Sequence, residues 1–235
     1  MKSELIITIV GSVAFVSTII MAVLLVKCNY HRKILMKLGL VEQSCPINWA
    51  AFSWNSCMEK LEYRADVVFF GDSIIRGGNF HKRFQHLKIV NLGSSGDSLA
   101  AMIRRIDGAR VLSPKKVFLL GGINGLTDMN IKKTAAKYEE LLNKLQEKIP
   151  AAQIYVHSVL PISRKKQLQI CKNSTIIKFN EMIKEIASRK GLEYVELHSS
   201  YFKNGELNPA MTKDGIHLLP EAYESWYERI EGYLK

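Results

Sequence analysis

Short apolar runs alternate with amphipathic stretches from residue 66 to the end of the chain. Runs typical of buried strands are Val67–Phe70, Lys88–Asn91, Lys116–Gly121, Gln153–Leu160 and Leu192–Leu197. Stretches with apolar residues at helical spacing are Ser98–Ile106, Asn130–Ile149, Asn173–Lys190 and Pro220–Leu234. This alternation predicts a parallel sheet with right-handed crossovers and helices on both faces. We therefore expect one flavodoxin-like, three-layer α/β/α domain over residues 66–235.

Polar residues directly before the helical stretches indicate where these helices begin. Ser98 is expected to cap the helix that opens with Leu99, because a side-chain oxygen at that position satisfies a free N–H group. The expected caps of the two long helices are Asp128 or Asn130, and Asn173 or Ser174.

The amino-terminal part of the chain has a different pattern. Ile6–Val26 contains no charged residue, and hydroxyls are its only polar side chains. At about 1.5 Å of rise per residue, such a helix spans roughly 30 Å of hydrocarbon. The pattern predicts a transmembrane anchor over residues 1–27. Residues 28–65 are expected to form a connector that packs partly on the domain.

The charge pattern bears on the surroundings of the domain. The formal net charge is +11, and the basic excess is spread over helices and loops without a nucleic-acid-binding motif. We interpret it as a surface near anionic lipid headgroups and expect no nucleic-acid partner. Lysine and arginine are more frequent after the predicted anchor than before it, which favours a cytoplasmic domain.

A candidate nucleophile follows the first strand-like run. Gly71-Asp72-Ser73 lies at the carboxyl end of Val67–Phe70, where open parallel sheets bind ligands and present nucleophiles. The same tripeptide recurs at Gly96-Asp97-Ser98, but Ser98 fits a helix cap better. We therefore predict Ser73 as the nucleophile, which needs a partner base because a free serine hydroxyl is a poor nucleophile.

Asp214 and His217 form the clearest candidate for that base. At a spacing of three residues on a loop, the carboxylate can accept the imidazole Nδ1–H and leave Nε2 free to take a proton. His198, which follows a strand-like run, is the main alternative, but no aspartate lies at short spacing from it. We predict His217 as the base and Asp214 as the residue that orients it.

Two further loops offer hydrogen-bond donors for an oxyanion. The Gly96 amide can approach a substrate oxygen closely because glycine has no side chain, and Gly93 could serve as well. Asn124 follows another apolar run and offers its side-chain amide. Together with the Ser73 amide, Gly96 and Asn124 make up the expected oxyanion hole.

In order and spacing, these motifs resemble those of the SGNH (GDSL) hydrolase family of esterases, lipases, thioesterases and polysaccharide deacetylases. The resemblance covers about residues 66–232 and rests on Gly71-Asp72-Ser73, Asn91-x-Gly-x-x-Gly96-Asp97, Gly122-x-Asn124 and Asp214-x-x-His217. It implies a flavodoxin-like fold, Ser73 as nucleophile, and Gly96 and Asn124 as oxyanion donors. The chain departs from the family pattern at Gly125, where an acidic residue is usual.

The sequence thus predicts a serine ester hydrolase that acts on an acetylated glycan or a lipid. The resemblance also implies that the domain lies outside the cytoplasm, against the charge pattern. No metal or organic cofactor is expected, because the sequence contains no phosphate loop, dinucleotide fingerprint or zinc-protease motif. Two alternatives remain: an O-acyltransferase that uses the same serine, and a membrane-tethered binding module without activity.

Overall fold

The structure is a computed structural model that describes residues 58, 59 and 61–235. The predicted anchor, residues 1–27, and most of the predicted connector lie outside the described residues. Within the described part of the chain, no helix is long and apolar enough to cross a membrane.

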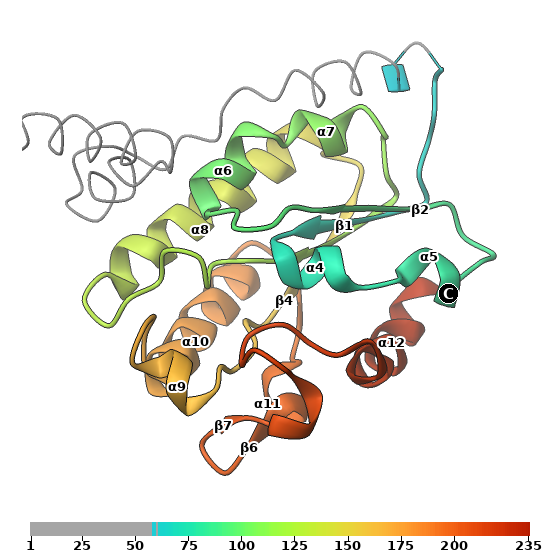
Figure 1. The fold of residues 1–235 in the computed structure, drawn as a ribbon. Helices are drawn as coiled ribbons and strands as arrows, with labels where there is room; N and C mark the ends of the chain where they lie inside the picture. The colour runs from blue at the N-terminus through green and yellow to red at the C-terminus, as the bar shows by residue number, and fades with distance from the viewer. Residues whose placement is uncertain (1–57, 60) are drawn as a thin grey trace, which may run out of the picture. The chain divides into compact units, whose positions relative to one another are not determined.

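A parallel sheet forms the centre of the domain (Figure 1). Its strands are β1 (Val67–Gly71), β2 (Ile89–Gly93), β3 (Lys116–Leu120), β4 (Gln153–His157) and β5 (Glu193–Val195). They lie in the order β2-β1-β3-β4-β5, and every neighbouring pair is parallel. This is the flavodoxin order, in which ligands bind outside the carboxyl ends of the strands where the order reverses, between β1 and β3. The predicted α/β fold with a parallel sheet is confirmed.

Helices cover both faces of this sheet (Figure 1). On one face, Val68 and Phe70 of β1 pack in a buried cluster with α6 (Leu99–Arg104), α8 (Ile131–Lys148) and α10 (Asn173–Arg189). On the other, Val67 and Phe69 pack with α4 (Ser73–Gly77), α5 (Phe80–Arg83) and α12 (Glu224–Glu231). Because successive strand residues point to opposite faces, a strand buried on both sides must be apolar throughout. This explains the continuous apolar run that precedes Ser73.

The remaining elements are short. Along the chain they are α7 (Asp107–Arg110), α9 (Arg164–Gln167), α11 (His198–Tyr201) and a two-stranded ribbon of β6 (Phe202–Lys203) and β7 (Glu206–Leu207). The 3₁₀ turns η1 (Pro209–Met211), η2 (Pro220–Tyr223) and η3 (Gly232–Leu234) complete the set. The predicted final helix is therefore α12 with a 3₁₀ turn at each end. The predicted run Gln153–Leu160 is a strand only as far as His157.

Helix starts agree with the sequence in part. Ser98 caps α6 as predicted, its hydroxyl accepting a hydrogen bond from the Ala101 N–H at 3.3 Å. Asn130 occupies the cap position of α8, though its side chain makes no capping bond there. Asp128 instead accepts from the Lys172 N–H at 2.9 Å, at the start of α10.

The expected cap of α10 was wrong. Lys172 holds that position, without a capping side chain. The buried Asn173 carboxamide turns away from the helix, accepts from the Ile162 N–H at 2.9 Å and donates to the Ile162 carbonyl at 2.8 Å. Buried loop backbone must find partners, and this need outweighed the local preference for a cap.

Candidate active site

The turn that carries Ser73 is fixed by the residues before it. Asp72 is fully buried and caps α4, accepting a hydrogen bond from the Ile74 N–H at 2.9 Å. A Cβ added at Gly71 would lie 2.1 Å from the carbonyl oxygen of Leu120, so only glycine lets β1 approach β3 here. Ser73 therefore opens α4 just beyond the carboxyl end of β1, and it is partly exposed.

Ser73, His217 and Asp214 form one hydrogen-bonded row. Nε2 of His217 lies 2.8 Å from Oγ of Ser73, and Nδ1 lies 2.5 Å from Oδ2 of Asp214. The serine and the histidine are 144 positions apart in the sequence. The side chains of His217 and Asp214 are 48% and 49% exposed, so the row lies at the surface, where a substrate can reach it.

The loop around Asp214 holds this carboxylate in place. Its Oδ1 accepts from the backbone N–H groups of Ile216 at 2.9 Å and His217 at 2.8 Å. The Thr212 hydroxyl accepts from the Gly215 N–H at 2.9 Å and donates to the His217 carbonyl at 2.7 Å. Gly215 has a φ of +83°, a left-handed conformation that favours glycine. The carboxylate and the imidazole are thus oriented by their own short loop.

The same contacts keep Asp214 ionised. Partial burial by itself works to raise the pKa of Asp214, but hydrogen bonds from the His217 side chain and from the backbone of His217 and Ile216 outweigh it. The net effect holds the pKa well below its usual value, because these bonds favour the charged form. An ionised Asp214 can only accept, so it fixes the His217 proton on Nδ1 and leaves Nε2 free to take one.

The loop after β2 contains the two candidate glycines. The Gly93 N–H donates to Oδ1 of Asn91 at 2.9 Å, and a Cβ at Gly93 would lie 2.1 Å from the Arg76 nitrogen. Gly93 therefore serves close packing. Gly96 has a φ of +76°, open space where a Cβ would be, and no acceptor for its N–H among the described residues. The geometry separates the two, and Gly96 is the one with an amide available for a substrate.

Asn124 links this loop to the one after β3. Its Nδ2 donates to the Asp97 carbonyl at 3.1 Å, which leaves the second hydrogen of the amide for another acceptor. The next residue, Gly125, has a φ of +106°. This left-handed backbone favours glycine, so the residue that departs from the family pattern fits the conformation of its loop.

Sequence reasoning missed Arg105, whose side chain connects several segments of the site. Its guanidinium pairs with Asp97 at 2.5 Å and donates to the carbonyls of Leu92 at 2.8 Å and Gly71 at 2.6 Å. It also lies over the Phe70 ring, 4.3 Å from the centroid. One side chain therefore joins the ends of β1 and β2 to the loop that carries Gly96. The only signal in the sequence was the aspartate of the second Gly-Asp-Ser motif.

The other histidines near the sheet are not placed to act as the base. His198 begins α11 and is buried; burial lowers its pKa, although Glu196 opposes this. His157 is fully buried, accepts a hydrogen bond from Nε1 of Trp226 at 3.3 Å, and burial lowers its pKa to about 3. The Ser73 hydroxyl has His217 as its imidazole partner instead.

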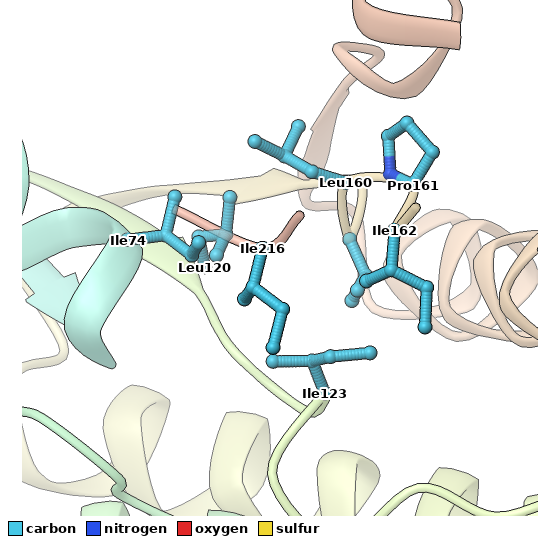
Figure 2. A pocket seen from close by; sticks show the side chains of 8 residues that line it. Ile74, Leu120, Ile123, Leu160, Pro161, Ile162 and Ile216 are labelled. Carbon is cyan, nitrogen blue, oxygen red and sulfur yellow. The ribbon is translucent and has the colours of Figure 1, made fainter. Parts of the chain in front are cut away.

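A small apolar pocket is lined in part by the chain neighbours of Ser73 and His217 (Figure 2). Figure 2 labels most of the residues that line it, which are Ile74, Leu120, Ile123, Leu160, Pro161, Ile162 and Ile216, and Val159 completes the lining. Ile74, Ile123 and Ile216 each adjoin in sequence one of Ser73, Asn124 and His217. The free space is about 10 Å³, enough for a single water-sized group.

The described residues, 58–59 and 61–235, contain no group of three or more histidine, cysteine, aspartate or glutamate side chains that could hold a metal ion.

Comparison with known proteins decides the family. The model of the GDSL-like lipase/acylhydrolase family matches residues 69–224. The chain belongs to this family. The matched segment contains the serine turn, both donor loops and the Asp214–His217 loop. The predicted family and the prediction of a serine ester hydrolase are therefore confirmed at the level of the family.

Individual relatives agree with this assignment. A multidomain esterase of Ruminococcus flavefaciens is 27% identical over 182 residues, which are 73% of this chain and 23% of that protein. The chain thus spans about a quarter of this curated relative. The solved structure of a GDSL-like lipase from Bacteroides thetaiotaomicron has a TM-score of 0.63 at 22% identity, covering 88% of this chain and 97% of that one. For the acetyl xylan esterase AlAXEase these values are 0.60, 19%, 72% and 99%. The two structures show a shared fold.

Proposed function

We propose that this chain hydrolyses carboxylic esters through Ser73, His217 and Asp214. The observation that carries the proposal is the unbroken row of hydrogen bonds from the Ser73 hydroxyl through His217 to Asp214. As Ser73 Oγ attacks the ester carbonyl carbon, its proton passes to Nε2 of His217, and Asp214 stabilises the resulting imidazolium. His217 then gives this proton to the departing alcohol, which leaves an acyl group on Ser73. Water attacks the acyl-enzyme with His217 as base, releasing the acid and restoring the serine.

The oxyanion that forms in both steps needs donors close to Ser73. The free Gly96 N–H, the second hydrogen of the Asn124 amide and the Ser73 N–H at the start of α4 supply them. Such donors act mainly on the transition state, and losing one typically costs about a hundred- to a thousandfold in rate. Arg105 supports them indirectly, since it fixes the loop that carries Gly96 to the end of β1.

The acyl group of the substrate is short in this proposal. The apolar pocket is lined by the chain neighbours of the nucleophile, the base and Asn124, so it is suited to the acyl chain of a bound ester. Its free space accommodates a methyl-sized group, which favours acetyl esters over long fatty acyl esters. An acetylated glycan or a lipid that carries a short acyl group fits this requirement.

An ester series and two serine variants test the proposal. We expect 4-nitrophenyl acetate to be hydrolysed fastest, with kcat/KM falling as the acyl chain lengthens to butyrate, octanoate and dodecanoate. Ser73→Ala should abolish turnover and labelling by a fluorophosphonate probe. The matched control is Ser98→Ala, in the second Gly-Asp-Ser motif, which should retain most activity because Ser98 caps α6. A folded Ser73→Ala protein with normal turnover would refute the assignment.

Hydrolysis and acyl transfer are separated by their products. With a radiolabelled acetyl donor and an added glycan, the hydrolase releases free acetate. Label recovered mainly on a glycan hydroxyl would make the protein an O-acyltransferase that uses the same serine. A folded wild-type protein that neither turns over nor reacts with the fluorophosphonate would be the non-catalytic binding module.

The location of the domain is also a proposal. The uncharged run Ile6–Val26 supports a membrane anchor, and the basic residues after it favour the cytoplasmic side. Deleting residues 1–27 should release an active protein that turns over a soluble ester normally but a membrane-bound ester poorly, because tethering raises local concentration. Degradation of a carboxyl-terminal tag by protease added to intact cells would place the domain on the outer side.

A further inference from the structure

A second hollow, distinct from the apolar pocket, lies on the other side of the Asp214 loop. It has a volume of about 460 Å³, and its lining includes the ammonium-bearing side chains of Lys165, Lys166 and Lys213, together with Glu206 and Asp214. This volume is in the range of small-molecule sites and would hold a monosaccharide or a phosphorylated glycerol. Apart from Asp214, the side chains that line this hollow take no part in the hydrolytic chemistry proposed above.

The charges in the hollow do not balance. The two carboxylates are already engaged, since Asp214 holds His217, and Glu206 accepts from the Arg164 N–H at 2.9 Å and lies 3.5 Å from the Arg164 guanidinium. None of the three lysines has a carboxylate within 4.0 Å among the described residues. The lining therefore carries three lysines, none in an ion pair within the described part of the chain, against two carboxylates, which leaves a net positive charge of one and suits an anion.

The hollow is joined to the catalytic loop by direct contacts. The Ser163 N–H donates to the Gly215 carbonyl at 2.9 Å, and a Cβ at Gly215 would lie 2.1 Å from the Ser163 hydroxyl oxygen. The segment with Lys165 and Lys166 is thus docked on the residue that follows Asp214. A ligand held by these lysines is fixed relative to the Ser73–His217 row.

The same two segments divide the hollow from the apolar pocket. Ile162 and Ile216 line the pocket, whereas their chain neighbours Ser163 and Gly215 line the hollow. A substrate whose acyl chain enters the pocket must direct its alcohol elsewhere. The hollow, whose lining includes Asp214 and Gly215, offers a cationic place for this alcohol.

We propose that this lysine hollow binds an anionic group, a phosphate or a carboxylate, carried by the alcohol portion of the ester. The inference rests on the ester hydrolysis proposed above and adds to it the charge of the substrate. Lysine binds phosphate as a point charge, and several surface lysines together concentrate anionic substrates by their field. The substrates that fit are short acyl esters of a glycerophosphate, such as a lipid headgroup offers, or of an acidic sugar.

Two matched pairs of acetate esters test the proposal with the full chain. Monoacetin is compared with 1-acetylglycerol 3-phosphate, and 3-O-acetylglucose with 3-O-acetylglucuronate, so each pair differs in its anionic group. We expect kcat/KM to be about tenfold higher for the anionic member, the order of one or two surface ion pairs. The advantage should shrink at 0.5 M NaCl, because salt screens exposed charges. A larger advantage in the phosphate pair assigns a phosphate headgroup, and a larger one in the sugar pair assigns an acidic glycan.

Charge variants locate the effect. Lys165→Gln/Lys166→Gln/Lys213→Gln should raise KM for the anionic esters about tenfold, leave kcat nearly unchanged, and alter turnover of the neutral esters less than twofold, because only uniform binding is removed. The control Lys132→Gln/Lys178→Gln/Lys184→Gln removes the same charge from exposed lysines outside the hollow. The proposal is overturned if both triple variants change KM for the anionic esters to the same extent. It is also overturned if the hollow variant reduces kcat/KM equally for neutral and anionic esters.

Failure of this inference can be told apart from failure of the proposed function. If the protein hydrolyses neutral and anionic esters equally well, the proposed function stands and only the role given to the lysine hollow is wrong. If no ester is hydrolysed, calorimetry with glycerol 3-phosphate still tests the hollow, and binding by the wild type must be lost in the hollow variant and kept in the control. Should the triple variant fail to fold, as seen by circular dichroism, Lys213→Gln alone must raise KM for the anionic esters about twofold.

Discussion

Replacing Asp214 by asparagine tests the catalytic row without disturbing its loop. In the Asp214→Asn variant the amide oxygen can still accept from the backbone N–H groups of Ile216 and His217, which lie 2.9 and 2.8 Å from Oδ1 of the wild-type carboxylate. The change is confined to the other atom, where an NH₂ group replaces the oxygen that lies 2.5 Å from Nδ1 of His217. An amide donor at this place favours the tautomer with Nδ1 bare and the proton on Nε2, which then cannot accept the Ser73 proton.

The size of the loss follows from the bonds that the productive tautomer must give up. It loses a hydrogen bond to a charged group, worth about 1.5–3 kcal/mol, of which we take the lower half because both side chains are about half exposed. This tautomer also brings the new amide NH₂ into contact with the Nδ1–H group of His217. If the amide flips instead, the backbone N–H groups lose their acceptor. Either arrangement costs about 1–3 kcal/mol. The sum is roughly 3–5 kcal/mol, and kcat should therefore fall about 10²- to 10⁴-fold.

The fall in kcat is measured by the rate of 4-nitrophenyl acetate hydrolysis at pH 8. The melting temperature of each variant is recorded as well. Asp214→Asn should melt within a few degrees of the wild type, because its loop contacts survive. Asp214→Ala should lose as much activity and also melt lower, since it removes the acceptor of the Ile216 and His217 backbone N–H groups. A well-folded Asp214→Asn protein that keeps more than a third of the wild-type kcat would refute the role given to Asp214.

Further expectations concern the base, a buried acid and the acyl pocket. His217→Ala should reduce kcat by several orders of magnitude and His198→Ala by less than about threefold, and the reverse order of effects would make the Asp214–His217 loop structural. Burial raises the pKa of Asp72 to about 7 from an unfolded value near 3.8, so its ionisation destabilises the fold as pH rises from about 4 to 7. Asp72→Asn keeps the cap acceptor, and its melting temperature relative to the wild type should increase over that interval; a pH-independent difference contradicts this. Ile162→Ala should enlarge the pocket and move the preferred ester from acetate towards butyrate or longer, and an unchanged chain-length profile would exclude the pocket as the acyl site.

Features that depend on near neighbours in the chain could be predicted. The apolar run before Ser73 and the helical spacing after Ser98 depend on local pattern, and the cap predicted at Ser98 is the one observed. The Asp214–His217 contact was also readable, because three residues of loop bring the two side chains within reach of each other. The predicted cap of α10 was wrong, because the Asn173 side chain accepts a hydrogen bond from the distant Ile162 N–H instead of capping its own helix.

The sequence by itself determined the alternation of strands and helices, the family motifs and the chemistry available in each loop. Only the tertiary structure decided which loops meet. A parallel sheet brings the carboxyl ends of its strands to one edge, but spacing along the chain does not say that Ser73 reaches His217, or that Arg105 joins Asp97 to Gly71. It also showed that Gly93 is closely packed whereas Gly96 lies open, and it fixed the size of the apolar pocket. These properties depend on distances between segments remote in sequence, which the packing of the core sets.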